Sequence, residues 1–492
     1  MAPEMLSGQS LRCEYLVVGS GAGGSVAAAL LAEAGRDVLM VEEGNWPPEN
    51  SNPSNIGELT ALLYRNRGVF PLLGSPTIPL GEARCVGGGT AINGALLWRT
   101  PPSILDEWRT VNGLTGYGED SLAKHFDTVE SDLHVTRHEL EEDANLDSLY
   151  LFRGTGELGW KASTVPRAVT HCANVSLCPV GCPPCGKQDT TKNYIPRALR
   201  NGAGLLANCR VRKIVHTNGV ARKVIAEVAG PESTSAIEIE FDHLVLACGA
   251  IQTPHLLRRS KISSTAGRKL EFHMNLKTVA LFRQPVYAER GTIFTVQVQE
   301  FRRRGIVIMP SCLQPHYLVT TVAHHGTDAI NHVFSHYDHA AVYVTMLRQK
   351  TQGRVVSAFG EQPIVWQRFD RRDMDLILEA LRRTTEVLFA SGAVELFLPI
   401  GGSGRITSPG DLEEKLSSLT PKQLEILTVH IMASCPMGPS AEDSVVRPDG
   451  RLWNMKNVFL ADASILPSNI GESPQGTIMA FAHEVIGRHL AD

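Results

Sequence analysis

Cysteines are the first residues in this sequence whose spacing could build a chemical site. Cys172, Cys178, Cys182 and Cys185 follow one another closely, with gaps of five, three and two residues between them. Such short loops can direct several sulfurs toward one iron–sulfur cluster or zinc ion. This spacing fits none of the usual metal-binding patterns, so we favour a disulfide pair or unligated thiols and assign no metal ligands.

Histidines are the second candidates, because an imidazole with a pKa of about 6.5 can accept a proton at neutral pH. The chain has 17 histidines, and five lie between residues 324 and 339. His332 and His336 could share a helix face as a metal pair does, but we favour polar surface or loop histidines there. His430 stands before the run SCPMG with one intervening segment, IMA. Residue type alone does not distinguish it from the other histidines.

The elements that would position such side chains begin with residues 15–44. An apolar run stops at the turn GSGAGG, an Ala/Leu-rich run follows, and a second apolar run ends at Glu42. This order predicts a strand, a tight glycine turn, a helix and a strand. Gly19 permits the turn, Gly21 lets a pyrophosphate approach the backbone, and Gly24 lets the helix pack on the strand. Glu42 can accept hydrogen bonds from a ribose.

A second glycine-rich stretch, GEARCVGGGTAIN, covers residues 81–93. Its three successive glycines precede Thr90 and a helical start, so the backbone and a helix N-terminus can lie against a ligand. A single nucleotide fold needs only one such loop. Two loops therefore indicate a long cofactor contacted at both ends, as FAD would be.

The last part of the chain is expected to return to the first sheet. Residues 237–250 predict an apolar strand, and residues 457–460 predict another that leads to Asp462. Thr477 begins a closing helix. A carboxylate at a strand end and a threonine at a helix start suit the ribityl hydroxyls and the polar edge of a flavin.

Residues 265–400 have a different texture. The runs TIFTVQVQ, GIVIMP, HYLVTTV and HAAVYVTML alternate partly between apolar and polar residues, which predicts strands of an antiparallel sheet. We interpret this region as a substrate-binding domain. Earlier in the chain, residues 204–216 predict a short strand pair.

Composition excludes several classes of protein. The 492 residues suffice for two domains, and 47 basic residues nearly balance 51 acidic ones. We therefore expect no nucleic-acid partner held by bulk electrostatics. No run of about 18 apolar residues predicts a transmembrane segment, and the N-terminus has neither the apolar nor the basic region of a signal peptide. A cytoplasmic location is the expectation.

Four separated stretches together resemble the glucose–methanol–choline (GMC) oxidoreductases. They are GSGAGG…VEEG, GEARCVGGGTAIN, LACGAIQTPHLLRRS at residues 246–260, and HIMASCPMG…FLADASILPS…SPQGT. The resemblance implies an α/β protein with an FAD-binding, doubly wound (Rossmann-like) domain and an α+β substrate domain with an antiparallel sheet. From the sequence we place the FAD-binding domain at residues 1–264 and 421–492, and the substrate domain at residues 265–420.

The resemblance also implies roles for individual residues. A small-molecule alcohol would give its hydroxyl proton to His430 and hydride to flavin N5, and oxygen or another electron acceptor would reoxidise the flavin. Gly19, Gly21, Gly24 and Glu42 would hold the ADP half of FAD, with Val211 near the adenine. The implied contacts to the flavin and ribityl portions are Gly88, Asn93, Asp462 and Thr477.

One departure from the family pattern concerns the second active-site residue. The family commonly has a histidine or asparagine shortly before the threonine of the closing helix, but this chain has ESPQGT. Ser473 occupies the asparagine position, and Glu472 or Gln475 could also reach the substrate oxygen. No histidine stands in the GGGT block, so we expect non-covalent FAD.

Alternative functions remain open from the sequence. The family includes cyanohydrin lyases that need FAD without net redox chemistry. The cysteine loop is similar to a loop that holds an iron–sulfur cluster in some sugar dehydrogenases of the family, which would pass electrons to a separate carrier. The substrate could be a sugar, an aminoglycoside or another biosynthetic intermediate.

Overall fold

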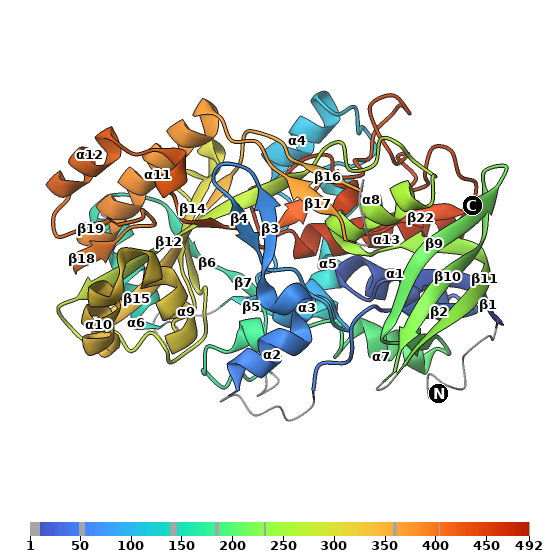
Figure 1. The fold of residues 1–492 in the computed structure, drawn as a ribbon, viewed down its shortest axis with the longest axis horizontal. Coiled ribbons are helices and arrows are strands. Elements are labelled where there is room, and N and C mark those ends of the chain that lie inside the picture. The colour runs from blue at the N-terminus through green and yellow to red at the C-terminus, as the bar shows by residue number, and fades with distance from the viewer. Residues whose placement is uncertain are drawn as a thin grey trace.

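Two large sheets lie toward opposite ends of the long axis of the protein (Figure 1). The computed structural model describes residues 10–48, 55–137, 145–182, 186–230, 233–357, 362–402 and 404–491. The first sheet has seven strands in the order β8-β2-β1-β11-β10-β9, with β22 beside β11. Its parallel strands are β1 (Ser10–Val18), β2 (Val38–Val41), β8 (Gly204–Leu206), β11 (Thr234–Leu246) and β22 (Val458–Leu460), and β9 (Cys209–Thr217) and β10 (Val220–Ala229) are antiparallel.

The helix α1 (Ala22–Glu33) connects β1 to β2 and lies in the core. It is apolar nearly all round, because it packs between α7 (Tyr194–Arg200), α13 (Gln475–Ala491) and the sheet. Its run of alanines lets these neighbours approach closely. The strand, glycine turn, helix and strand predicted for residues 15–44 are therefore confirmed, as is the α/β fold class with its doubly wound domain.

Glycines allow the first turn of α1 to touch three strand ends. Gly19 has φ +102°, and a β-carbon on Gly24 would overlap the carbonyl oxygen of Gly19. A β-carbon on Gly23 would overlap the carbonyl oxygen of Ala461, which follows β22. Gly24 thus lets α1 pack closely on the end of β1, and Gly23 lets it pack closely on the segment after β22.

The strand pair predicted for residues 204–216 is wrong. Both β8 and β9 form there, but β8 pairs with β2, whereas β9 pairs with β10 at the opposite edge of the sheet. The two strands are only two residues apart in sequence, and their partners come from residues 38–41 and 220–229. Local pattern contains no information about those partners.

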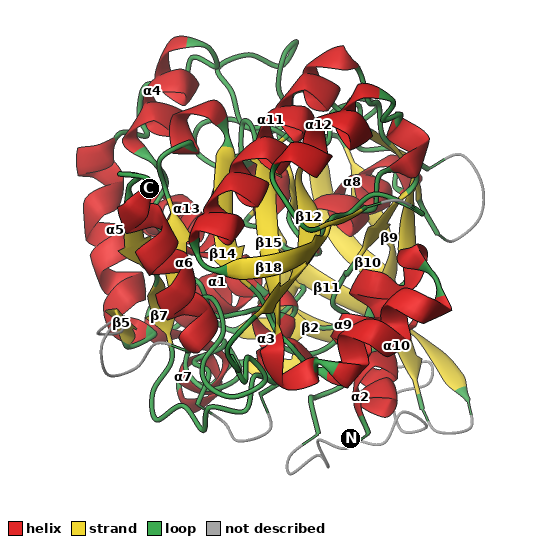
Figure 2. Cartoon of the chain, turned by 90° about the vertical axis from the view of Figure 1, so that its left-hand side faces the viewer, coloured by secondary structure: helices red, strands yellow, loops and turns green. Residues whose placement is uncertain are grey.

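The second sheet has nine strands and matches the predicted antiparallel sheet. Its main order is β19-β18-β12-β15-β14-β13-β6, with β20 and β21 beside β12. Helices α11 (Arg371–Ala390) and α12 (Gly410–Ser417) cover one side of β12, β15 and β18 (Figure 2). The strands are β6 (Ala162–Thr164), β12 (Glu271–Phe282), β13 (Val296–Val298), β14 (Ile306–Pro310), β15 (Ala340–Arg348), β18 (Ala393–Phe397), β19 (Arg405–Ile406), β20 (Ile426–Leu427) and β21 (Ile431–Met432).

One of the four strands predicted in this region is a helix. TIFTVQVQ, GIVIMP and HAAVYVTML contain β13, β14 and β15, but HYLVTTV lies in α9 (Pro315–Val322). Pro315 occupies the first turn of this helix, where a missing N–H costs nothing. Leu318 and Val322 are buried on successive turns, so burial on a helical period outweighs the β-propensity of valine and threonine.

The remaining elements connect and cover the two sheets. A four-stranded sheet, β16-β17-β3-β4, lies between them (Figure 1). The domain boundaries at residues 264 and 420 stay a prediction from the sequence. The connecting and covering elements are β3 (Phe70–Leu73), β4 (Ile78–Leu80), β5 (Val135–Arg137), β7 (Pro166–Ala168), β16 (Arg354–Val356), β17 (Ile364–Trp366), α2 (Ile56–Leu63), α3 (Gly89–Ile92), α4 (Pro102–Thr110), α5 (Glu119–Asp132), α6 (Leu146–Glu157), α8 (Gly249–Arg259), α10 (Thr327–Ser335), α11 (Arg371–Ala390) and α12 (Gly410–Ser417).

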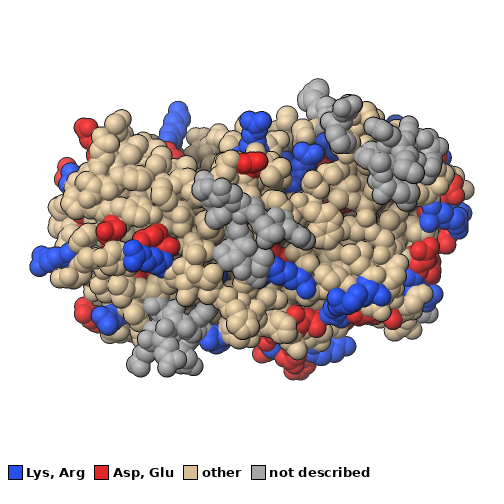
Figure 3. Space-filling model, turned by 90° about the horizontal axis from the view of Figure 1, so that it is seen from below, with Lys and Arg blue, Asp and Glu red and all other residues tan. Residues whose placement is uncertain are grey.

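The surface carries interspersed charges of both signs on the face shown in Figure 3. This distribution agrees with the nearly balanced composition. Within the described parts of the chain, the helices are all too short or too polar to cross a bilayer.

Gly23→Ala should destabilise the protein, because its new β-carbon would overlap the backbone after β22. We expect the free energy of unfolding to fall by at least about 3 kcal/mol. Gly487→Ala is the matched control, since Gly487 lies in α13 with open space around its α-carbon. The free energy of unfolding of Gly487→Ala should rise by up to about 1 kcal/mol. Urea unfolding of both variants measures the difference, and equal midpoints would contradict the packing role of Gly23.

Candidate active site

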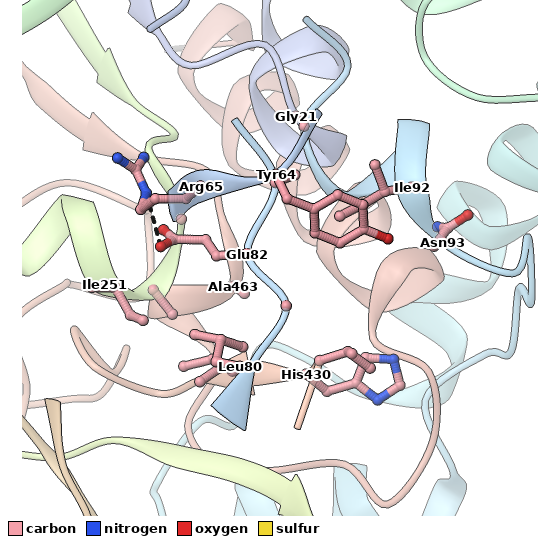
Figure 4. Close-up of a pocket in the computed structure, with 18 of the residues that line it drawn as sticks. Gly21, Tyr64, Arg65, Leu80, Glu82, Ile92, Asn93, Ile251, His430 and Ala463 are labelled. Carbon is pink, nitrogen blue, oxygen red and sulfur yellow. Dashed lines mark ion pairs between the residues drawn. The ribbon is translucent and has the colours of Figure 1, made fainter. Parts of the chain in front are cut away.

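A cavity of about 900 Å³ runs between the two large sheets and receives residues from the start, middle and end of the chain. Figure 4 shows Gly21 at its upper end and His430 at its lower end. Most of the residues predicted for the site line this cavity: Gly19, Gly21, Glu42, Gly88, Asn93, Val211, His430, Asp462 and Ser473. Gly24 and Thr477 do not line it. Gly24 packs against β1, and the hydroxyl groups of Thr477 and Thr100 are 2.8 Å apart.

The glycine end of the cavity has the groups that a dinucleotide needs. Gly21 is the N-cap of α1 and makes no side-chain cap hydrogen bond, so the first backbone N–H groups of α1 are available to a phosphate. A β-carbon on Gly88 would lie 2.8 Å from the α-carbon of Gly21. The two glycine-rich loops predicted from the sequence therefore meet, and a ligand can contact both.

Glu42 is held in place by its own turn. Its Oε2 accepts hydrogen bonds from the Ser20 N–H at 3.0 Å and the Ser20 hydroxyl at 2.8 Å. Its Oε1 accepts one from the Gly44 N–H at 2.9 Å. Burial raises the pKa of the carboxyl, although these hydrogen bonds oppose the shift. The Ser20 hydroxyl also accepts a bond from the Gly87 N–H at 3.1 Å, which ties the two loops together.

Asp462 joins the strand ends at the middle of the cavity. Its carboxylate accepts hydrogen bonds from the Thr253 hydroxyl at 2.5 Å, the Gly249 N–H at 2.9 Å and the Ser464 N–H at 2.8 Å. Burial raises its pKa. These bonds hold the start of α8 against the segment after β22, as the sequence prediction for the end of the nucleotide domain requires.

A buried ion-pair cluster beside the glycine end was missed by sequence reasoning. Arg65 lies 2.8 Å from a Glu43 oxygen and 2.9 Å from a Glu82 oxygen, and all three residues line the cavity. Figure 4 shows the pair of Arg65 with Glu82. Burial raises the pKa of Glu82. For Glu43 burial also acts upward, but Arg65, Arg210 and Arg84 together outweigh it and the pKa is lowered. The two carboxylates belong to different segments of the chain, so no local pattern could pair them through one arginine.

His430 makes its ring contact with another histidine. The Nδ1 atoms of His430 and His273 are 3.1 Å apart, and the rings are nearly perpendicular at 89°. Burial lowers the pKa of His430 to about 4 and that of His273 well below its usual value. Both rings are therefore neutral at pH 7. His273 has no sequence signal of its own, because it is one residue of a buried strand.

The hydrogen bonds indicate which nitrogens carry protons. The Gly471 N–H donates to Nε2 of His273 at 3.0 Å, so the proton of neutral His273 is on Nδ1. The Nδ1–H of His273 therefore donates to Nδ1 of His430. The proton of neutral His430 is then on Nε2. In this arrangement His430 presents an N–H donor to a molecule in the cavity.

The segment ESPQGT places three polar side chains at the cavity, and each has a different environment. The Ser473 hydroxyl donates to the Leu96 carbonyl oxygen at 3.3 Å. The Gln475 Oε1 accepts a bond from the amide of Asn93. The fully buried carboxylate of Glu472 accepts bonds from Gln297 at 3.0 and 3.1 Å and lies 2.7 Å from Arg302. Burial raises the pKa of Glu472 to about 7.

The cysteine loop is anchored by a buried lysine. Lys187 donates hydrogen bonds to the carbonyl oxygens of Ala91 at 2.6 Å, Cys178 at 2.9 Å and Asn93 at 3.2 Å. The loop is thereby fixed against the second glycine-rich stretch.

The described thiols of this loop are free. Cys172, Cys178 and Cys182 form no disulfide, and no three described His, Cys, Asp or Glu side chains are grouped as metal ligands. A hydrogen bond with Cys178 lowers the pKa of Cys182 to about 5. Cys185 lies outside the described residues.

Comparison with known proteins identifies the family. GMC oxidoreductase models match residues 13–275 and 361–482. This chain belongs to the GMC oxidoreductase family. It is accordingly an FAD-dependent alcohol oxidoreductase, and the resemblance read from its motifs is confirmed. The glycine turn, Glu42 and Asp462 fit FAD in this cavity, while the absence of a covalent link stays a prediction.

Three proteins illustrate the range of similarity. A GMC-type oxidoreductase of Sinorhizobium fredii is 30% identical over 96% of this chain and 94% of its own. A long-chain-alcohol oxidase of Arabidopsis thaliana is 27% identical over 98% of this chain and 69% of its own. The crystal structure of pyridoxine 4-oxidase from Mesorbium loti superposes with a TM-score of 0.74 at 18% identity, covering 98% and 99% of the two chains.

His273 should act as a positioning residue for His430. His273→Leu removes both ring hydrogen bonds, whereas His273→Gln can keep an amide N–H toward His430 and a carbonyl oxygen toward Gly471. We expect the leucine variant to slow anaerobic flavin reduction by an alcohol about 10- to 100-fold with little change in KM, because His430 loses its orientation. The glutamine variant should stay within a few fold of wild type.

Stopped-flow absorbance of the flavin measures both variants. Equal losses in the two variants would indicate a purely structural role for His273, and an unimpaired leucine variant would show that the histidine pair is dispensable.

Proposed function

We propose that this protein oxidises an alcohol to a carbonyl compound, with His430 holding the substrate hydroxyl. The position of His430 carries this proposal. Its ring lines the cavity that also contains the glycine turn and Asp462. Among the described residues, its ring nitrogens have one partner, His273 at Nδ1, which leaves Nε2 for the substrate oxygen. FAD bound in this cavity supplies a hydride acceptor, N5 of its flavin ring.

The hydroxyl proton must also leave, and His430 is the first group that can take it. Its lowered pKa keeps the ring neutral at pH 7. Accepting a proton at Nε2 requires the tautomer in which Nδ1 of His430 donates to His273. The Gly471 N–H then loses its acceptor, which costs about 1–3 kcal/mol for a buried group.

Glu472 is the second group that can take the proton. Glu472 borders the same cavity with its carboxyl buried behind the cavity wall, and burial raises its pKa to about 7. A base acts best when its pKa is near the working pH. Glu472 precedes Ser473, whose hydroxyl we propose turns from the Leu96 carbonyl oxygen to donate a hydrogen bond to the substrate oxygen.

The substrate side of the cavity supports an alcohol with an apolar portion. The lining side chains from β14 and β15 are Met309, Val344 and Met346, and Leu96 and Phe294 pack against them. The long-chain-alcohol oxidase of Arabidopsis thaliana offers a precedent within the matched relatives. Oxygen or a separate electron acceptor would take the electrons from the reduced flavin. Admitting air to the reduced enzyme tests whether oxygen is the acceptor.

An anaerobic screen of primary alcohols, sugars and aminoglycosides tests the function through loss of flavin absorbance. His430→Asn should slow flavin reduction by about 10²- to 10⁴-fold and still bind FAD, because asparagine can donate a hydrogen bond but cannot accept the proton. Oxidised flavin after every alcohol class would contradict the proposal. Turnover of a substrate without any flavin reduction would indicate a lyase.

The pH profile separates the two proton acceptors. A base ionises by losing a proton, so the rate falls as pH drops through its pKa. With His430 as the base, kcat/KM should stay level down to about pH 4. With Glu472 as the base, kcat/KM should already fall as pH drops below about 7. Glu472→Gln should then remove this fall from the pH profile.

A further inference from the structure

Four polar side chains occupy one face of β12 at alternate positions. They are Glu271, His273, Asn275 and Lys277, because a strand places residues i, i+2 and i+4 on the same side. His273 meets His430, whereas Asn275 and Lys277 line the cavity. From His273 onward, the central strand of the second sheet thus presents polar groups that lead away from the proposed reaction site.

Lys277 stands out because no carboxylate or carbonyl oxygen among the residues that the structure describes bonds its ammonium. Nζ lies 5.2 Å from the centroid of the Tyr317 ring. Lys187, the other lysine deep in this region, has three carbonyl acceptors. Lys277 keeps exposed surface at the cavity, so its ammonium is open to a ligand.

The neighbours of Lys277 do not supply negative charge. Burial raises the pKa of the Cys312 thiol to about 11 and that of the Tyr317 hydroxyl well above its usual value, so both groups are neutral at pH 7. Burial lowers the pKa of Lys277 itself, as an unpaired buried ammonium requires. An anionic group that enters the cavity would offset this cost.

Two further polar atoms near this end lack partners in the described structure. Nδ2 of Asn275, in a side chain that is only 4% exposed, donates no hydrogen bond, and Nε2 of His316 has none either. Asn275 and His316 both line the cavity. Buried polar groups are normally hydrogen-bonded, so these atoms indicate space for a polar ligand group.

We propose that Lys277 and Asn275 form a carboxylate-binding subsite, so that the substrate is a hydroxy acid with its acid group remote from the hydroxyl. This inference rests on the proposed function, because it places the reacting hydroxyl at His430. The α-carbons of residues 273 and 277 are about 13 Å apart along the strand. The lysine side chain shortens the span, and the methionines and valine of β14 and β15 cover the methylene chain between the two ends.

A matched pair of probes, 8-hydroxyoctanoate and 1-octanol, tests the subsite on the FAD-loaded enzyme. Wild type should show the higher kcat/KM for the hydroxy acid. Lys277→Met should lower the ratio of the two values at least about tenfold, because a charge-assisted hydrogen bond is lost, and Lys277→Arg should preserve it. Lys422→Met, at an exposed lysine, is the control and should leave the ratio unchanged.

Calorimetric binding of octanoate, which has no hydroxyl to oxidise, separates the subsite from the reaction. Binding that weakens at least about tenfold in Lys277→Met supports the subsite, even if no alcohol reduces the flavin and the proposed function fails. An unchanged ratio and unchanged octanoate binding in Lys277→Met overturn the subsite while oxidation of 1-octanol stands. A change in flavin reduction potential without a change in the ratio would assign Lys277 to the flavin and also overturn it.

Discussion

The first turn of α1 meets the ends of β1, β11 and β22 with no side chains between them. At Gly23 and Gly24 a single added carbon would overlap backbone atoms that follow β22 or end β1. This contact brings together the first and last parts of the chain, because the backbone of Ala461 packs against α1, which begins at Ala22. The second glycine loop then joins the same point through Ser20, whose hydroxyl bonds both Glu42 and the Gly87 N–H. These close contacts form the end of the cavity that Gly19, Gly21 and Gly88 line.

The opposite wall of the cavity depends on β12. This strand pairs with β15, β18, β20 and β21, so it is fixed along its length before any ligand is considered. His273 on β12 orients His430, and Lys277 lies farther along the same face. A single strand therefore sets both the position of the His430 ring, through His273, and the distance from that ring to the Lys277 ammonium. Sites built on such elements are held more accurately than sites built on loops.

Sequence reasoning succeeded where a local pattern has one physical solution. A strand, a glycine turn and an apolar helix can be recognised within one short stretch, and the four motifs in their order were specific enough to identify the family. It failed where two solutions compete. The run HYLVTTV has the residues of a strand, but its burial period is that of a helix. The halves of residues 204–216 both form strands, and only distant partners decide that they lie at opposite edges of the sheet.

The sequence by itself determined the family, the α/β class, the cofactor and the glycine, acidic and histidine residues that the motifs contain. Each of these depends on residue types at short spacing, which a single chain displays directly. The tertiary structure decided which groups surround them: His273 beside His430, Arg65 between two glutamates, and Lys277 beside the Tyr317 ring with no counter-ion among the described residues. Proton positions, pKa shifts and charge balance depend on distances of a few ångströms between residues far apart in sequence, and only the folded chain sets those distances.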